Sequence, residues 1–185
     1  MAARLGDGLD EAVQKTFTRP IPKSAGARMR YLVKQHKATK PVADLLGITQ
    51  RTVERYVKDE IRSPRAKLAA RMEREVKKRW QPQIRAKARQ QAATVGGIVV
   101  DTRARFGYTA APGSTDDSRL RHLTVALPPE YAARLFDARE QGATERQLRE
   151  IAAEGLQEIY FKDRGRRAEG LLIEFTDVQH IEFDL

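Results

Sequence analysis

The sequence predicts an α+β protein, in which an all-helical domain with a helix-turn-helix precedes a small α+β domain with an antiparallel sheet and a protruding hairpin. Apolar side chains recur at helical spacing in residues 1–95, which carry 23 Lys and Arg against 9 Asp and Glu, a net of +14. Residues 96–185 contain alternating apolar and polar side chains and carry 12 basic against 16 acidic residues, a net of −4. The charge needed to bind phosphates therefore lies in the first domain.

Residues 39–58 have the pattern of a helix-turn-helix. Two short helices each carry one apolar face, and Gly47 lies where the turn between them needs a positive φ. A helical hairpin inside an ordinary bundle shares the apolar pattern, but it does not explain the polar outer face of the second helix. Gln and Arg can make paired hydrogen bonds to base edges in the major groove. The predicted DNA contacts on this helix are Gln50, Arg51, Thr52, Arg55 and Lys58.

A long basic helix is predicted over residues 63–92, with Ser63-Pro64 as its capping hydroxyl and first-turn proline. Pro82 removes one hydrogen bond and is expected to kink or interrupt it. Trp80 is expected to be a packing anchor. Residues 62–89 hold 11 Lys and Arg against two Glu, a density that favours phosphate contacts for several of them and a solvated face for the others. The predicted phosphate contacts are Arg62, Arg65, Lys77, Lys78 and Arg79.

Two shorter helices are predicted ahead of the helix-turn-helix. The first covers about residues 9–16 and ends before Pro20. The second begins after Ser24, whose hydroxyl can cap a helix that runs to about Gln35. This second helix is expected to brace the helix-turn-helix.

Beyond residue 97 the apolar spacing changes from helical to alternating. Residues 98–108 and 119–127 predict the two strands of an antiparallel hairpin. The loop between them is the polar segment 109–118, TAAPGSTDDS. Hydroxyl side chains on a turn usually make only local hydrogen bonds. The hydroxyls in the middle and at the end of this loop are Ser114, Thr115 and Ser118.

Two helices and two further strands complete the predicted second domain. The helices cover residues 128–140 and 144 to about 161, and Thr144 with Gln147 forms a capping box at the start of the second. Residues 171–175 and 181–185 alternate again and are expected to join the same antiparallel sheet.

Composition excludes several classes of protein. The chain has no Cys, so it can form neither a disulfide nor a thiolate zinc site. It shows no apolar run of membrane-span length and no signal-peptide core after Met1, which predicts a cytoplasmic protein that does not bind a membrane. Familiar enzyme motifs are missing, the three His residues are scattered, and no metal site is predicted. Asp101 with Asp116 or Asp117 is the one suggestion of a metal, and a solvated turn is the favoured role of the last two.

Four segments together resemble the telomere terminal proteins of linear actinomycete chromosomes and plasmids, the Tpg family. They are TKPVADLLGITQRTVERYV, SPRAKLAARMEREVKKRW, VVDTRARFGYTAAPGSTDDSRLRHLTVALP and LLIEFTDVQHIEFDL, so the resemblance covers essentially the whole chain. It implies a protein covalently joined to the 5′ ends of DNA. A threonine hydroxyl replaces the primer 3′-OH in that family, and the position that matches it here is Thr115, with Ser114 and Ser118 as the fallback hydroxyls.

The same resemblance implies three partners: telomeric DNA, as duplex and as the linked 5′ end, a telomere-associated companion protein, and a DNA polymerase. No His or Lys lies near Thr115 in the sequence, so activation of its hydroxyl is expected from a divalent metal such as Mg²⁺ held by the polymerase. The chain itself is expected to have no cofactor and to be a protein primer rather than an enzyme. Its place would be in the nucleoid, at chromosome or plasmid ends.

Two other classes remain as alternatives. The first is a helix-turn-helix transcriptional regulator, with residues 96–185 as its dimerisation or effector domain. The second is an enzyme that nucleotidylates itself, which would need a carboxylate pair to hold two metals, and Asp101 with Asp116 or Asp117 is the only suggestion of one.

Overall fold

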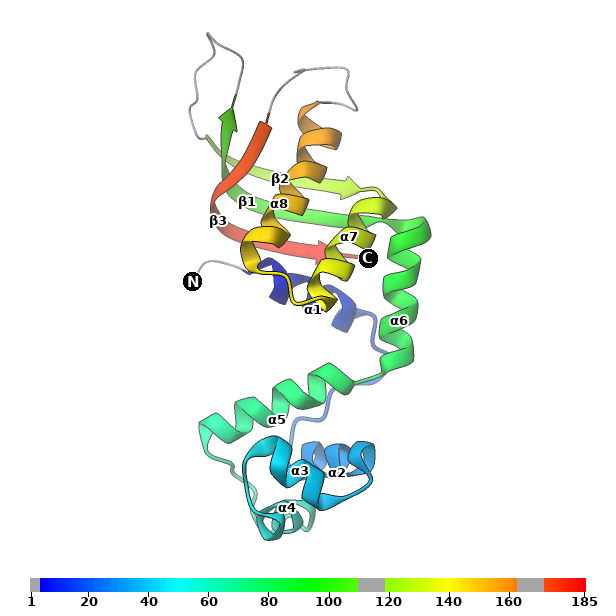
Figure 1. Cartoon of the computed structure of the whole chain (residues 1–185), viewed down its shortest axis with the longest axis vertical. Coiled ribbons are helices and arrows are strands. Elements are labelled where there is room, and N and C mark those ends of the chain that lie inside the picture. Colours follow the sequence, from blue (N-terminus) through cyan, green and yellow to red (C-terminus); the bar gives the residue numbers. More distant parts are fainter. Residues whose placement is uncertain (1–3, 110–118, 163–171) are drawn as a thin grey trace. The chain divides into compact units, whose positions relative to one another are not determined.

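A computed structural model of the chain describes residues 4–109, 119–162 and 172–185 (Figure 1). These residues form eight α-helices and a three-stranded antiparallel sheet, so the α+β fold class predicted from the sequence is confirmed. The chain divides into two compact units. We call Thr18–Pro82 the helical unit, and Met1–Phe17 together with Gln83–Leu185 the sheet unit.

The helical unit contains α2 (Ala25–His36), α3 (Thr39–Leu46), α4 (Gln50–Val57) and α5 (Ala66–Arg79). Helix α2 begins as predicted, because the side chain of Ser24 accepts a hydrogen bond from the N–H group of residue 27 at 3.3 Å. One apolar core joins all four helices. Its buried side chains are Ala25, Met29, Leu32, Val42, Ala43, Leu46, Val53, Tyr56, Met72 and Val76.

The predicted basic helix over residues 63–92 is interrupted, as expected at Pro82. It forms two helices, α5 and α6 (Pro82–Gln91). A proline disfavours the helical conformation in the residue before it, and Gln81 has a φ of 45°.

Helix α5 begins later than predicted, whereas the residue at its end packs as predicted. The predicted start at Ser63-Pro64 is wrong, because Arg65 is the N-cap residue and makes no side-chain capping bond. Ile61 packs against the core of the helical unit, so the chain contacts that core before it turns into the helix. At the other end, Trp80 is the predicted packing anchor: its ring centroid lies 4.8 Å from that of Tyr31.

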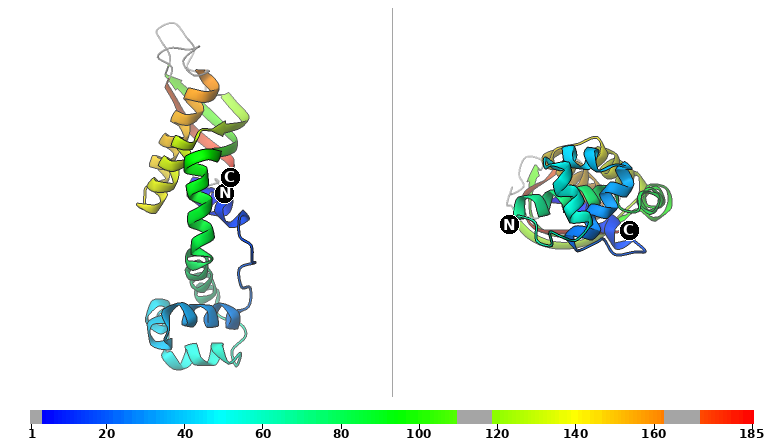
Figure 2. Two further views of the ribbon diagram at one scale, coloured as in Figure 1. Left: turned by 90° about the vertical axis from the view of Figure 1, so that its right-hand side faces the viewer. Right: turned by 90° about the horizontal axis from the view of Figure 1, so that it is seen from below.

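The sheet unit has strand order β2-β1-β3. The strands are β1 (Ile98–Thr109), β2 (Arg119–Leu127) and β3 (Leu172–Asp184). Helices α7 (Pro129–Glu140) and α8 (Glu145–Leu156) lie on one face of this sheet (Figures 1 and 2). The buried side chains of that face form the core of the unit with those of the helices, whereas the opposite face is polar.

Two short segments of wider helical turn flank these elements. They are η1 (Ala92–Gly96), which precedes β1, and η2 (Gln157–Phe161), which continues α8. The predicted capping box at the start of α8 is confirmed. The Thr144 side chain accepts from the Gln147 N–H at 3.3 Å, and Gln147 Oε1 accepts from the Thr144 N–H at 2.8 Å.

The two strands predicted over residues 171–175 and 181–185 are one strand, β3. Its pairing with β1 shifts register twice, opposite Arg103/Ala104 and Arg105/Phe106, and each shift leaves one extra residue on β3. Each bulge lengthens the spacing between inward positions from two residues to three, first between the partly buried Phe175 and Val178 and then between Val178 and Ile181. This breaks the alternation visible in the sequence. The fully inward positions are Ile173, Val178, Ile181 and Phe183.

Helix α1 (Leu5–Lys15) belongs to the sheet unit, although the sequence pattern placed it in the basic N-terminal domain. Its apolar side chains are buried in one core with those of the strands. Glu145 Oε1 accepts a hydrogen bond from the Leu5 N–H at 2.7 Å, and Arg139 donates to Asp10 at 2.7 Å. These partners are 140 and 129 positions apart, so the spacing within α1 cannot reveal them.

Helix α6 belongs to the sheet unit from its second residue, Gln83, onwards. The division of the chain therefore differs from the predicted boundary between residues 95 and 96. Arg89 of α6 forms an ion pair with Glu140 of α7, and its guanidinium carbon lies 5.5 Å from the centre of the Phe136 ring. In the described part of the chain, every helix is too short or too polar to cross a membrane.

Candidate nucleic-acid interface

Helices α3 and α4 are joined by a three-residue turn. Gly47 ends α3 with a φ of 62°, the left-handed conformation that the sequence predicts for it. The Ile48 N–H donates to the Ala43 carbonyl at 3.0 Å, and the Thr49 hydroxyl accepts from the Thr52 N–H at 3.2 Å. The end of one helix and the start of the next are therefore both hydrogen-bonded, and the turn holds α4 in a defined position.

Arg71 of α5 stabilises the same turn from outside the motif. Its Nη1 donates to the carbonyl oxygen of Leu46 at 2.6 Å, so a cation satisfies a terminal carbonyl of α3. The contact leaves little room at Gly47, where a Cβ would lie 2.8 Å from Arg71 Nη1. Sequence reasoning gave Arg71 no role, because its partner lies 25 residues away.

A second contact fixes the end of α4 against α2. Arg30 of α2 donates to the Val57 carbonyl at 2.9 Å and to Asp59 Oδ2 at 2.6 Å. Helix α2 and the segment after α4 approach each other closely, since a Cβ on Gly26 would lie 1.8 Å from Asp59 Oδ1. Helix α2 therefore braces the helix-turn-helix, as the sequence predicts.

The predicted DNA contacts on α4 fall into two groups. Three of them have local partners: Gln50 donates to Glu54 at 3.1 Å, the hydroxyl of Thr52 lies 2.8 Å from that of Thr49, and Arg55 donates to Glu60 at 3.3 Å. The other two, Arg51 and Lys58, are exposed, and neither has a side-chain partner within the described residues. This second group is therefore available to a ligand without breaking an existing contact.

The predicted phosphate contacts at the start of α5 are open to solvent. Arg62 and Arg65 are exposed, and they too have no side-chain hydrogen bond or ion pair in the part of the chain that the structure describes. Long cationic side chains in this state can contact a DNA backbone and release its counterions.

The predicted phosphate contacts at the end of α5 are paired with acids. Lys77 lies 2.8 Å from Glu73, and Arg79 lies 2.6 Å from Glu75. Lys78 is 3.9 Å from the same Glu75 and is exposed. Of these three cations, Lys78 is the one whose charge is most accessible to solvent.

Both acids are held in their charged form. The hydrogen bond from Lys77 lowers the pKa of Glu73, with the nearby charge of Arg28 acting in the same direction. Burial favours a raised pKa for Glu75, but the hydrogen bond from Arg79 and the charges of Lys78 and Arg79 outweigh it, so this pKa is also lowered.

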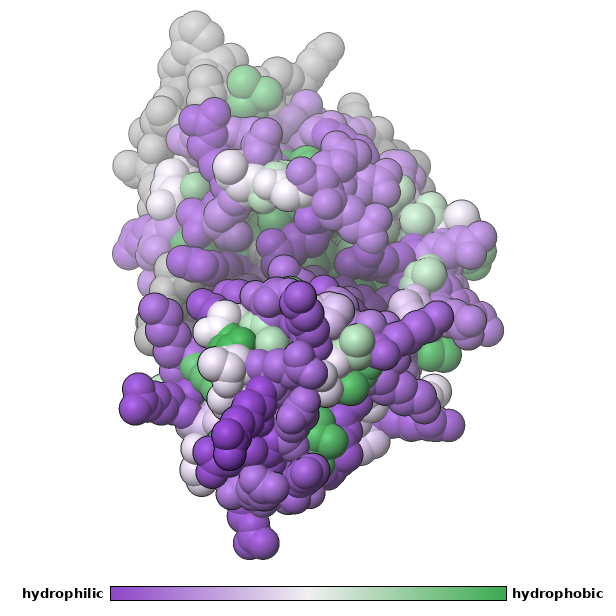
Figure 3. Space-filling view, turned by 60° about the horizontal axis from the view of Figure 1, so that its bottom comes forward, coloured by the Kyte–Doolittle hydropathy of each residue, from purple (hydrophilic) through white to green (hydrophobic). Residues whose placement is uncertain are grey.

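The net positive charge per residue is higher in the helical unit, residues 18–82, than in residues 1–95 as a whole. The helical unit holds 18 Lys and Arg against 6 Asp and Glu, a net of +12, and its surface in Figure 3, where it occupies the lower part, is predominantly hydrophilic. Sequence reasoning missed three exposed lysines around the α2–α3 junction, Lys34, Lys37 and Lys40. Their spacing of three residues and the absence of acids beside them were the available signal.

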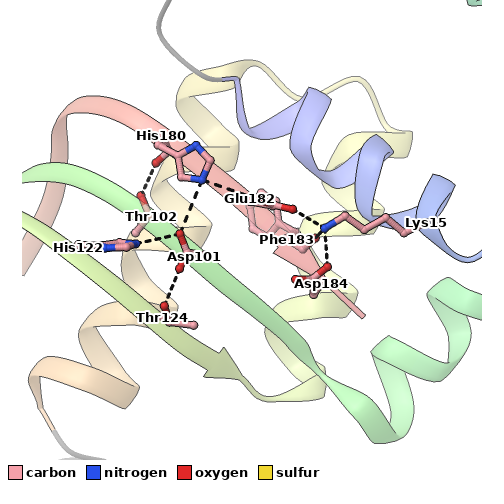
Figure 4. A network of polar contacts seen from close by, with 9 residues as sticks. All are labelled: Lys15, Asp101, Thr102, His122, Thr124, His180, Glu182, Phe183 and Asp184. Atoms are coloured by element: carbon pink, nitrogen blue, oxygen red, sulfur yellow. Dashed lines mark hydrogen bonds and ion pairs between the residues drawn. The ribbon is translucent and has the colours of Figure 1, made fainter.

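A polar network lies on the face of the sheet opposite α7 and α8 (Figure 4). Asp101 of β1 is at its centre and accepts from the Thr124 hydroxyl at 2.6 Å. His122 Nε2 lies 3.1 Å from Asp101 Oδ1, and His180 Nε2 lies 3.7 Å from it. The hydrogen bonds from Thr124 and His122 and the charges of both imidazoles lower the pKa of Asp101. A salt bridge between Lys15 and the acids at the end of β3 borders this network (Figure 4).

This network gathers side chains from three strands that sequence reasoning treated as scattered. His122 and His180 both pair in register with Arg103, which is why they flank the central strand together. Within the described residues, however, no three His, Asp or Glu side chains are arranged to hold a metal ion. The network orients exposed polar groups on the sheet.

The predicted priming residue Thr115, the fallback hydroxyls Ser114 and Ser118, and the acids Asp116 and Asp117 lie outside the described residues. The structure describes the strands on either side of that segment, which pair antiparallel.

The described arginine side chains of β1 and β2 lie on opposite faces of the sheet. Arg103 and Arg105 are exposed on the polar face, whereas Arg121 lies over the Phe161 ring at 5.6 Å, on the helix-covered face.

No protein-family model matches this chain, and no curated protein and no solved structure matches it.

Proposed function

We propose that this chain is a telomere terminal protein, which binds duplex DNA through its helical unit and becomes covalently attached to a 5′ DNA end through Thr115. The observation that carries the DNA-binding part is a helix-turn-helix with an exposed polar α4 inside a unit of net charge +12. The priming part is supported by the sequence resemblance at residues 110–118.

In the DNA-bound state α4 would enter the major groove, because its outer face presents Arg51 and Lys58 without competing partners among the described residues. Arginine can donate two hydrogen bonds to the O6 and N7 atoms of guanine. Arg62 and Arg65 would contact phosphates beside the motif, with Lys78 and the other cations of α5 adding to the attraction. Binding should therefore weaken steeply with salt.

In the priming step the hydroxyl oxygen of Thr115 would attack the α-phosphorus of a deoxynucleoside triphosphate. A bond forms between that oxygen and the α-phosphorus, the bond to the oxygen bridging the α- and β-phosphates breaks, and pyrophosphate leaves. The hydroxyl proton passes to a base or water in the polymerase active site, whose divalent metal ions supply the activation. The product is a threonine phosphodiester with a free 3′-OH, which the polymerase extends to patch a recessed DNA end.

This proposal places the protein in the cytoplasm, at the ends of linear replicons in the nucleoid. Its partners would be telomeric DNA, a DNA polymerase and a telomere-associated companion protein. The chain would need no cofactor of its own and would act as a primer rather than as an enzyme.

The priming step can be tested by labelling. Incubation of the full chain with a polymerase extract and an α-³²P-labelled deoxynucleotide should label the protein, and Thr115→Ala should abolish the label. Ser114→Ala and Ser118→Ala are the matched controls and should label normally. Loss of label in one of these controls instead would move the linkage to that serine, and no label on the wild-type chain would contradict protein priming.

A transcriptional regulator is the second candidate. Strand β2 lies at an edge of the sheet and, among the described strands, pairs only with β1. An edge strand can pair with the same strand of a second copy of the chain, as a dimeric regulator would require. Such a regulator would protect a palindromic DNA site and would be unaffected by Thr115→Ala.

A further inference from the structure

Gln50 and Glu54 form a hydrogen-bonded pair at the centre of the outer face of α4. The distance from Gln50 Nε2 to Glu54 Oε1 is 3.1 Å, and both residues are exposed. A carboxylate can only accept hydrogen bonds, so the Gln50 amide must direct its NH₂ group, not its oxygen, towards Glu54. The contact uses one of the two Gln50 N–H donors and holds the carboxylate in place on this face.

The carboxylate of Glu54 has no cationic partner within the described residues, although Arg51 and Lys58 lie three and four positions away on the same side of the helix. A negative charge on the surface proposed to face DNA repels phosphates, in a unit whose net charge of +12 attracts them. The Glu54 carboxylate therefore favours DNA binding only where a base offers it a hydrogen-bond donor.

The four bases differ in what they offer in the major groove. Guanine and thymine present acceptors, which oppose a carboxylate, and adenine presents its N7 acceptor beside its N6 donor. Cytosine presents an N4 amino donor and no acceptor. An acceptor-rich pair such as Gln50 with Glu54 is therefore complementary to cytosine, whereas a free Gln50 amide would suit adenine.

We infer that Glu54, held in position by Gln50, selects a cytosine in the bound duplex by accepting a hydrogen bond from its N4 amino group. This inference rests on the proposed DNA binding by α4. It makes Glu54 a specificity-determining residue on the same helix face as the cationic side chains of Arg51 and Lys58.

The test compares the duplexes that each full-length variant selects from a randomised library, followed by affinity measurements on the selected sites. The wild-type chain should prefer cytosine at one position by on the order of ten-fold over thymine. Glu54→Gln should reduce this preference to about two-fold or less, because an amide can face either a donor or an acceptor. Gln50→Ala should weaken the preference less than Glu54→Gln does.

Asp44→Asn on α3 is the matched control. Asp44 is an exposed acid of the helical unit, so its replacement changes the net charge by the same amount as Glu54→Gln. Both variants should bind non-specific DNA more tightly than the wild-type chain, but Asp44→Asn should keep the cytosine preference.

Two results would overturn the inference, and they differ. If Glu54→Gln selects the same sites as the wild-type chain, Glu54 reads no base while DNA binding by α4 stands. If the wild-type chain binds no duplex DNA even at low salt, the proposed function fails together with the inference.

Discussion

Arg71 on α5 donates a 2.6 Å hydrogen bond to the carbonyl oxygen of Leu46, the last residue of α3. This contact joins the basic helix to the turn of the helix-turn-helix. Phosphate binding by α5 and base reading by α4 would therefore share one rigid support.

The first prediction is that Arg71→Met destabilises the helical unit. The methionine can keep the packing of the alkyl chain, but the carbonyl of Leu46 loses its partner, which costs about 1–3 kcal/mol. Urea unfolding followed by circular dichroism measures the change. Arg65→Met is the control, because Arg65 is exposed and has no described partner, and an equal loss of stability in both variants would contradict the role of Arg71.

The second prediction concerns two glycines with positive φ. Gly97 has a φ of 70°, and a Cβ there would lie 2.2 Å from the backbone oxygen of Leu127. Gly142 has a φ of 79°, but nothing lies within 4 Å of its Cβ position. Gly142→Ala should therefore cost only the backbone strain, about 1–2 kcal/mol, whereas Gly97→Ala should cost clearly more or prevent folding of the sheet unit.

Thermal unfolding of the two glycine variants measures this difference. The comparison isolates the clash with Leu127, since both substitutions force a non-glycine residue into a positive φ. Similar melting temperatures for the two variants would show that the strand end near Gly97 can move away.

The third prediction is that Asp101 titrates below the ordinary range of an aspartate, and that Thr124→Val raises its pKa. The Thr124 hydroxyl is the main group that lowers this pKa. Because the folded pKa lies below the unfolded one, the charged Asp101 stabilises the fold above the unfolded pKa of about 3.9, and this contribution is lost as the pH falls through the folded pKa. NMR titration of the carboxyl carbon gives the value directly.

Thr176→Val is the matched control for that titration. The Thr176 hydroxyl donates to the Arg105 carbonyl at 3.1 Å on the same sheet, and it is not among the groups that shift the Asp101 pKa. A pKa of Asp101 that does not change in Thr124→Val would show that the 2.6 Å hydrogen bond is absent in solution.

The fourth prediction separates base reading from phosphate contact in the proposed DNA complex. Arg51→Ala should weaken binding mainly to the preferred site, whereas Arg65→Ala should weaken binding to all sequences alike and reduce the salt slope by about one. Fluorescence anisotropy at several salt concentrations measures both effects. If Arg51→Ala loses affinity equally for every duplex, Arg51 contacts the backbone and not a base.

Much of the local structure could be predicted because its causes lie within a few residues. Ser24, Gly47, Pro82 and the Thr144 capping box each act on the adjacent turn of the chain. The alternation in β1 was equally visible, because that strand has one buried and one polar face.

The candidate site was predictable to a smaller extent. The sequence identified the outer face of α4, but it did not distinguish Arg51 from Arg55, whose charge is paired with Glu60 at 3.3 Å. The fit of Thr115 to a priming role remains a proposal from resemblance, because that residue lies outside the described part of the chain.

By itself the sequence determined the fold class, the helix-turn-helix and the uneven charge, because these depend on residue type and short-range spacing. Only the tertiary structure decided that α1 packs with the sheet, that β3 is one bulged strand, and that Arg71 supports the turn. Each of these depends on contacts between residues far apart in the chain. Such contacts are selected by the total apolar area buried and the polar groups satisfied, which no local pattern records.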